Sequence, residues 1–155
     1  MRVAGISVDV PSRGRPATRL VVLDGSSGPT IEIAEVFTSD DVDLATQLHD
    51  MAEALRSRLD GLRVERVVVR RADRPPRASN TEGPRLRLLM EGAVASAARS
   101  VVVDTRVGTG KDTGAWYGSN KAGVDAVAAQ LLGQHGVAAA YGEATSAGLA
   151  ALAMP

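Results

Sequence analysis

Several kinds of residue are scarce in this chain of 155 residues. It has no cysteine, only two histidines and two lysines, and one tryptophan, two tyrosines and one phenylalanine. The lack of cysteine excludes disulfides and cysteine-ligated metals. No apolar run approaches the roughly 20 residues that a membrane-spanning helix needs. The start, Met1 to Gly5, leads directly into a strand-like segment and has no signal-peptide pattern. We therefore expect a soluble, cytoplasmic, globular protein.

The formal net charge is zero, but the charges are unevenly distributed along the chain. Eight arginines lie between Arg63 and Arg87, against three acidic residues, whereas acidic residues gather between Asp40 and Asp60. A basic block in a neutral protein indicates a local anionic partner such as nucleic acid. The alternative is codon usage, because an Ala-, Arg-, Val- and Gly-rich chain is typical of a GC-rich genome.

Two valine runs, Val67–Val69 and Val101–Val103, are apolar at every position. Such runs are typical of strands that are covered on both faces of a largely parallel sheet. Each run ends in charged residues, and ligands bind at the carboxyl ends of strands in open sheets. The predicted strands are 3–10, 20–23, 31–37, 64–69 and 100–104.

Helical spacing of apolar residues predicts a first helix that is capped by Thr38 or Ser39 and stopped by Gly61. His49 lies beside its apolar stripe and is interpreted as a packing or surface residue. Further helices are predicted at 86–98, 121–132 and 143–153, with a glycine-rich loop at 107–120. The order β-β-β-α-β-α-β-α-α predicts one α/β domain over 1–155, with three antiparallel strands followed by two parallel strands.

This order and several motifs resemble the RuvC family of Holliday junction resolvases, over nearly the whole chain. The motifs are Val67–Val69 with Asn80 and the helix segment 88–94, then 105–111, 121–124 with Leu131-Leu132, and 147–150. The resemblance implies a ribonuclease H-like fold and a metal-dependent endonuclease that acts on four-way DNA junctions. It also implies a homodimer, for which the helix 86–98 is a candidate face.

Metal-dependent nucleases of this kind need several carboxylates around Mg²⁺ or Mn²⁺, which activate a water and stabilise the leaving oxygen. The resemblance implies Asp9 and Glu143 as metal ligands. It also places Arg70 where the family has a glutamate, and Ser146 in the region of the last acidic pair. A cation at that position opposes metal entry by Coulomb repulsion, and Arg70 is expected to pair with Asp9 instead.

A second resemblance, to the YqgF-type putative resolvases, implies a different set of acids. Asp104-Thr105-Arg106 and the segment 125–129 are similar to that family's motifs, so Asp104 and Asp125 join Asp9 as catalytic candidates. Ser7 stands where that family has its first acid. Asp125 alternatively is a surface residue of its helix.

The segment Gly108-Thr109-Gly110-Lys111 fails as a P-loop, since the upstream glycine is missing and Asp112 replaces Ser or Thr. It suits contact with a phosphate. Trp116 and Tyr117 either stack on an unpaired base or anchor the loop. The predicted nucleic-acid contacts are Arg70, Arg71, Arg74, Arg77, Lys111, Trp116, Tyr117 and Lys121.

Three hypotheses follow from these residues. The first is a RuvC-like domain that binds branched or duplex DNA through its arginine-rich edge and has lost the full metal site. The second is an active endonuclease that uses Asp9, Asp104, Asp125 or Glu143 with Mg²⁺ or Mn²⁺. The third is a protein-interaction module in which the former nuclease site has no role.

Overall fold

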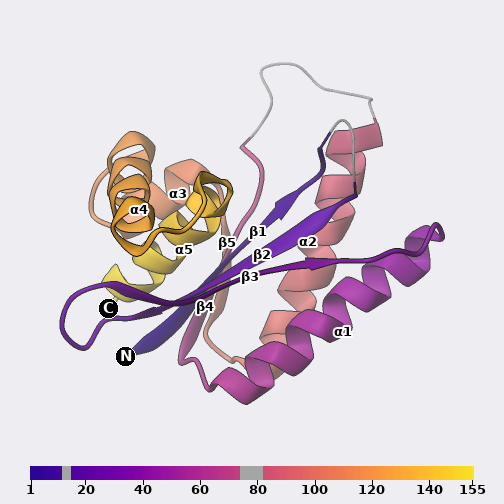
Figure 1. The fold of residues 1–155 in the computed structure, drawn as a ribbon, viewed down its shortest axis with the longest axis horizontal. Helices are drawn as coiled ribbons and strands as arrows, with labels where there is room; N and C mark the ends of the chain where they lie inside the picture. The colour runs from indigo at the N-terminus through magenta and orange to yellow at the C-terminus, as the bar shows by residue number, and fades with distance from the viewer. Residues whose placement is uncertain (12–14, 74–81) are drawn as a thin grey trace.

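The computed structural model describes residues 1–11, 15–73 and 82–155 of the chain. Its described part contains one five-stranded sheet with the strand order β3-β2-β1-β4-β5 (Figure 1). β1 pairs antiparallel with β2, which pairs antiparallel with β3, whereas β4 runs parallel to β1 and to β5. The predicted mixed sheet is therefore confirmed. The strands are β1 (Arg2–Asp9), β2 (Ala17–Asp24), β3 (Thr30–Thr38), β4 (Arg66–Arg70) and β5 (Thr105–Gly108).

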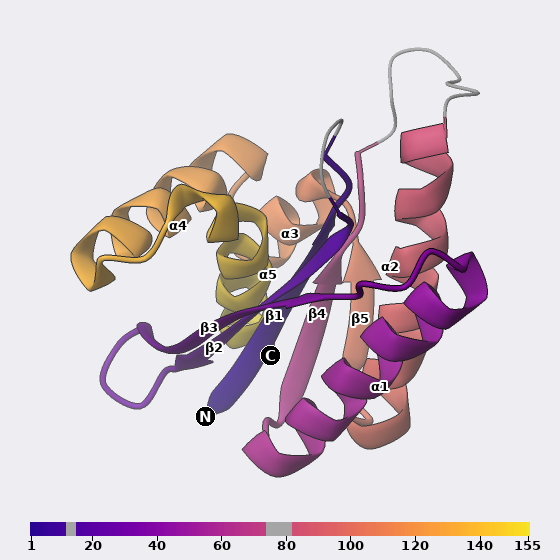
Figure 2. The same cartoon turned by 45° about the vertical axis from the view of Figure 1, so that its right-hand side comes forward.

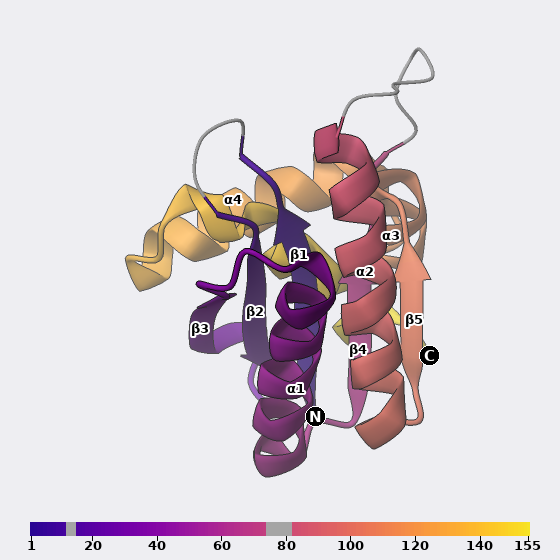
Figure 3. The same ribbon diagram turned by 90° about the vertical axis from the view of Figure 1, so that its right-hand side faces the viewer.

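Helices cover both faces of the sheet, as Figures 2 and 3 show from two sides. The helices are α1 (Leu44–Leu62), α2 (Glu82–Val101), α3 (Gly110–Trp116), α4 (Lys121–His135), the 3-10 turn η1 (Ala139–Tyr141) and α5 (Gly142–Ala153). α1 and α2 lie on one face, and α3, α4 and α5 on the other. None of the helices in the described ranges is long and apolar enough to cross a membrane.

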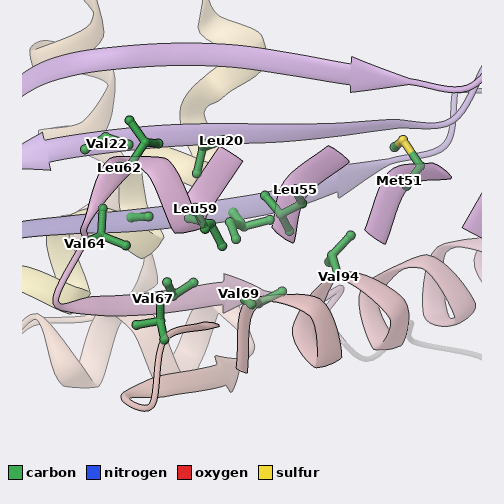
Figure 4. Packing of buried hydrophobic residues seen from close by; sticks show 14 of the residues in the cluster. Leu20, Val22, Met51, Leu55, Leu59, Leu62, Val64, Val67, Val69 and Val94 are labelled. Carbon is green, nitrogen blue, oxygen red and sulfur yellow. The ribbon is translucent and has the colours of Figure 1, made fainter. Parts of the chain in front are cut away.

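The core beneath α1 and α2 follows from the two-residue period of the strands. Ile6, Leu20, Val67 and Val69 point to this face and pack against apolar side chains of the two helices, including Leu55 (Figure 4). Val68 points to the opposite face, where it belongs to the core beneath α4 and α5. All five residues of β4 are buried, so the prediction that Val67–Val69 form a strand covered on both faces is confirmed.

α5 lies unusually close to β1 because Gly5 has no side chain. A Cβ atom built on Gly5 would lie 1.9 Å from the carbonyl oxygen of Ala144 and 2.4 Å from the nitrogen of Gly148. Both are backbone atoms, which no rotamer change can move. Ser7 and Asp9 share the face of β1 that Gly5 presents to α5, so this contact fixes α5 beside the carboxyl end of β1.

The prediction that the second valine run forms a strand is wrong. α2 continues to Val101, Val102 is buried in the core beneath α1 and α2, and Val103 is 79% exposed. The fifth strand begins at Thr105 and is a short strand at the edge of the sheet. A short apolar run cannot be assigned to strand or buried helix end by its hydrophobicity alone, which explains the error.

Helix ends differ from the predictions where a nearby polar residue makes the better cap. α1 begins at Leu44 and not after Ser39, because the side chain of Asp43 accepts a hydrogen bond from the Thr46 nitrogen. Gly61 does not stop α1, which ends at Leu62 with Arg63 in the left-handed conformation. The predicted loop 107–120 contains α3, whose start has a capping box between Thr109 and Asp112.

The outer side of α2 carries exposed Leu88 and Leu89, and an added Cβ on Gly92 would meet nothing within 4 Å. A single chain does not test the predicted homodimer, which stays a prediction for this helix.

Candidate functional site

A cleft of about 590 Å³ opens at the carboxyl ends of β1 and β4, bordered by α4 and by the start of α5. It is lined by five residues that the sequence singled out, from four elements: Asp9, Arg70, Lys121, Asp125 and Glu143. The fold therefore brings these residues together. The cleft is also lined by Ser7, which the sequence marked only as the residue in place of an acid, and by Arg19 and Arg87, which sequence reasoning missed.

Arg70, the last residue of β4, lies at the base of this cleft and is only 2% exposed. One of its terminal nitrogens lies 3.5 Å from a carboxylate oxygen of Asp125, and the same nitrogen lies 3.4 Å from the Thr113 hydroxyl. Gly110 makes room for the guanidinium, since a Cβ built there would lie 2.3 Å from the other terminal nitrogen. A buried cation thus occupies the position where the family resemblance implies a carboxylate.

Ser7, and not Asp9, is the β1 residue directly beside Arg70. The parallel register pairs Ser7 with Arg70, and Ser7 is 4% exposed. Asp9 lies two residues further along β1, is 53% exposed and pairs with Arg19 at 3.2 Å. The expected Arg70–Asp9 ion pair is therefore wrong. The two-residue period of a strand gives Ser7 and Asp9 the same face, but it does not say which lies at the base of the cleft.

Each carboxylate that lines the cleft has a cationic partner. Asp9 pairs with Arg19, Asp125 with Arg70, and Glu143 with Arg87 at 2.9 Å. Asp125 also accepts a 2.7 Å hydrogen bond from the buried hydroxyl of Ser146 on α5.

These residues do not fit the divalent metal that the resemblance implies. In the described part of the chain, no group of three or more His, Asp or Glu residues could hold a metal ion. The cleft has a hydroxyl at Ser7 and a guanidinium at Arg70. Ser146, whose side chain bonds to Asp125, also carries a hydroxyl and not a carboxylate. Mg²⁺ and Mn²⁺ need anionic oxygen ligands, and the fixed positive charge of Arg70 repels a divalent cation in the same cleft.

Glu91 of α2 is a buried carboxylate behind the Arg87–Glu143 pair. Both of its oxygens accept hydrogen bonds from the Ala72 nitrogen, at 2.8 and 3.2 Å, and Arg87 lies 3.7 Å away. Burial raises the pKa of Glu91 above its usual range, against the lowering effect of the Ala72 hydrogen bond. Through its hydrogen bonds with the Ala72 nitrogen, Glu91 holds the start of the loop after β4 against α2.

A second groove, of about 550 Å³, adjoins the cleft and shares Asp9 and Arg87 with it. Arg71, Arg85 and Asp73 also line this groove. Asp73 pairs with Lys121, and although burial raises the pKa of Asp73, the hydrogen bonds from Lys121 and the Gly110 nitrogen hold it below its usual value. Together the two grooves are lined by six cationic and four acidic side chains: Arg19, Arg70, Arg71, Arg85, Arg87 and Lys121, with Asp9, Asp73, Asp125 and Glu143.

The other predicted nucleic-acid contacts lie elsewhere. Arg74, Arg77 and Asn80 fall outside the described residues. Lys111 is exposed on α3 but lines neither groove. Trp116 and Tyr117 are half-buried against the core beneath α4 and α5, and the Trp116 ring lies where a side chain on Gly108 would be. Their packing matches an anchoring role, and base stacking by them stays a prediction. His49 is on the surface of α1.

Asp104 does not lie in the cleft. It precedes β5 and pairs with Arg66, the first residue of β4. Asp104 therefore lies at the amino end of β4, whereas Arg70 lies at its carboxyl end. The expectation that Asp104 joins Asp9 and Asp125 depended on a fifth strand ending at Asp104. Because β5 begins after Asp104, this residue is separated from the other candidate acids.

The position of Asp104 predicts a specific acid sensitivity. The hydrogen bond from Arg66 lowers the pKa of Asp104 below its ordinary value of 3.8. A carboxyl whose pKa is lower in the folded state stabilises the fold above its ordinary pKa, and this contribution is lost as the pH falls through the folded value. We expect Asp104→Asn to have a flatter stability profile below about pH 5 than the wild type, as measured by urea unfolding from pH 7 to pH 3. The exposed Asp60→Asn is the control, and an unchanged profile in Asp104→Asn would contradict the assignment.

Comparison with known proteins establishes the fold class. No family model matches the sequence, and no curated protein matches it. Among solved structures, a RuvC structure from Thermus thermophilus is similar with a TM-score of 0.70 and 16% identity, covering 99% of this chain and 94% of that chain. T. thermophilus RuvC in complex with a Holliday junction substrate is similar with a TM-score of 0.69 and 19% identity, covering 99% and 93%. The predicted ribonuclease H-like fold, in the arrangement seen in RuvC, is confirmed.

Proposed function

We propose that this protein binds branched or duplex DNA through the basic edge at the carboxyl ends of β1 and β4, without metal-dependent cleavage. The observation that carries this proposal is the buried guanidinium of Arg70 at the base of the cleft. It supports phosphate binding, because it supplies positive charge where a nuclease of this fold would hold metal ions.

The surroundings of Arg70 also support a nucleic-acid partner. The six cations of the two grooves exceed their four acids, and Arg71 and Arg85 are exposed. Guanidinium groups bind phosphate oxygens with two parallel hydrogen bonds, which favours arginine at such surfaces. One of the structural neighbours was solved with a Holliday junction substrate, which favours a four-way junction as the first DNA to test.

Binding of this kind should depend steeply on salt. If the edge contacts about four phosphates, the affinity should fall roughly 100-fold between 50 and 200 mM salt, because bound phosphates release their counterions. Fluorescence anisotropy with a labelled four-way junction and a duplex of equal length measures this slope, in EDTA so that metal plays no part.

Exposed arginines of the second groove offer variants that keep the fold. In Arg71→Gln/Arg85→Gln, we expect the slope of log affinity against log salt to fall by about two, one unit for each lost phosphate contact. Arg99→Gln, an exposed arginine at the other end of α2, is the matched control and should leave the slope unchanged. Equal slopes in all three proteins would place the binding surface elsewhere.

The alternatives give different results in the same assay. Cleavage of the junction with Mg²⁺ or Mn²⁺, lost in Asp9→Asn, would contradict the proposal and support an active endonuclease. Absence of binding to both DNAs at 50 mM salt would contradict it in favour of a protein-interaction module.

A further inference from the structure

The walls of the cleft differ in chemistry according to the elements that supply them. Its charged side chains come mostly from β1, β2, β4, α2 and the starts of α4 and α5. A second part of the lining, here called the apolar wall, consists of small or apolar residues from the end of α4 and the segment that follows it: Ala129, Leu132, Gly133, Val137, Ala139 and Ala140. Phosphate binding uses only the charged side, so the apolar wall has no role in the function proposed above.

The base of the cleft offers hydrogen-bond donors that the described residues do not use. A guanidinium has five N–H donors, and Arg70 makes only a 3.4 Å hydrogen bond and a 3.5 Å ion pair within the described part of the chain. Both are long for charge-assisted contacts. Arg70 lines the cleft although it is only 2% exposed, so a ligand bound at this point lies beside these unused donors.

The apolar wall is partly exposed to solvent. Ala129, Ala139 and Ala140 are exposed, and a Cβ built on Gly133 or Gly142 would meet nothing within 4 Å. At about 590 Å³, the cleft lies within the range of sites for small organic ligands. A ligand that matches it has an anionic group and an apolar group.

We infer, building on the DNA binding proposed above, that the cleft takes one unpaired nucleotide. Its phosphate binds Arg70 and the neighbouring cations, and its base packs on the apolar wall at Ala139 and Ala140. Base recognition by apolar surfaces is general in sites that accept a nucleotide outside the stack. A paired nucleotide in a duplex cannot present its base to this wall, so the cleft selects unpaired positions.

The test compares three DNAs with the same number of base pairs by anisotropy in EDTA: a fully paired duplex, the same duplex with one bulged adenine, and one with a bulged abasic site. The bulged adenine should raise the affinity roughly tenfold over the paired duplex, the gain expected when roughly 55 Å² of the base is buried against apolar side chains. The abasic bulge carries the same phosphate without the base and should bind within about threefold of the paired duplex.

Two alanines of the same segment provide matched variants. Ala140→Asp adds charge and bulk to the wall and should abolish the preference for the bulged adenine. Ala138→Asp carries the same charge at an exposed position that does not line the cleft, and it should keep the preference. Circular dichroism of both variants confirms that they fold.

The outcomes separate this inference from the function on which it rests. Equal affinity for paired and bulged duplexes, or equal effects of the two variants, would overturn the inference and leave the proposed DNA binding intact. Absence of binding to all three DNAs would overturn both. Competition with millimolar dAMP, with inorganic phosphate as the control, shows whether a free nucleotide binds the cleft. Displacement of the bulged DNA by dAMP shows that a free nucleotide suffices, and absence of displacement shows that the nucleotide must be part of a strand.

Discussion

Gly5→Ala should lower the free energy of unfolding by about 3 kcal/mol or more, a large effect for the addition of one methyl group. The new Cβ would lie 1.9 Å from the Ala144 oxygen and 2.4 Å from the Gly148 nitrogen. Because both atoms belong to the backbone of α5, the clash is relieved only if the whole helix moves away from β1. Urea unfolding at constant m-value measures the change.

Gly92→Ala is the control for Gly5→Ala, since Gly92 lies within α2 and an added Cβ there meets nothing within 4 Å. It should leave the protein as stable as the wild type or more stable by up to about 1 kcal/mol, the difference in helix propensity. If Gly5→Ala cost less than about 1 kcal/mol, α5 would not be seated on β1 as described. Movement of α5 would also shift Glu143 and Ser146, so folded Gly5→Ala protein should bind bulged DNA less well.

Arg66→Met should lower the free energy of unfolding by about 2 to 4 kcal/mol. The buried guanidinium of Arg66 donates hydrogen bonds to the carbonyl oxygens of Ala151, Met154 and Pro155, and to the carboxylate of Asp104. It thereby satisfies the Ala151 carbonyl in the last turn of α5, which has no partner within the helix, and two carbonyls just beyond the helix. Methionine keeps much of the volume but leaves all four acceptors without this donor.

Arg99→Met makes the same change at an exposed site and should cost less than about 0.5 kcal/mol. Arg66→Lys should recover only part of the loss, because an ammonium group cannot reach the four acceptors in the planar geometry that a guanidinium allows. Equal stability of Arg66→Met and Arg99→Met in urea unfolding would contradict the role described for Arg66.

The sequence was sufficient for the parts of the fold in which a local pattern has a single interpretation. Val67–Val69 lie in a strand that is buried on both faces, and the residue that follows, Arg70, lines the cleft as the strand order predicts. The pattern failed at Val101–Val103, because a helix end that is partly buried has the same composition as a short strand. The capping box at Thr109 and Asp112 was a local signal for α3 that the prediction did not use.

The partners in the site could not be predicted, since they depend on how elements far apart in sequence pack together. Arg70 pairs with Asp125, which is contributed by α4, and Arg87 of α2 pairs with Glu143 of α5. Whether Ser7 or Asp9 lies at the base of the cleft depends on the register between β1 and β4, which no single strand specifies. Gly5, in the middle of a strand, was the available hint of a close backbone approach.

The positive charge of Arg70 differs from that of a bound metal ion in what controls its presence in the cleft. A metal site fills and empties with the free concentration of the ion, and a chelator can strip it. The positive charge at the base of this cleft belongs to the chain itself and lies buried between β4 and α3. Its amount always equals the amount of folded protein, so cells starved of divalent ions would retain this charge in full.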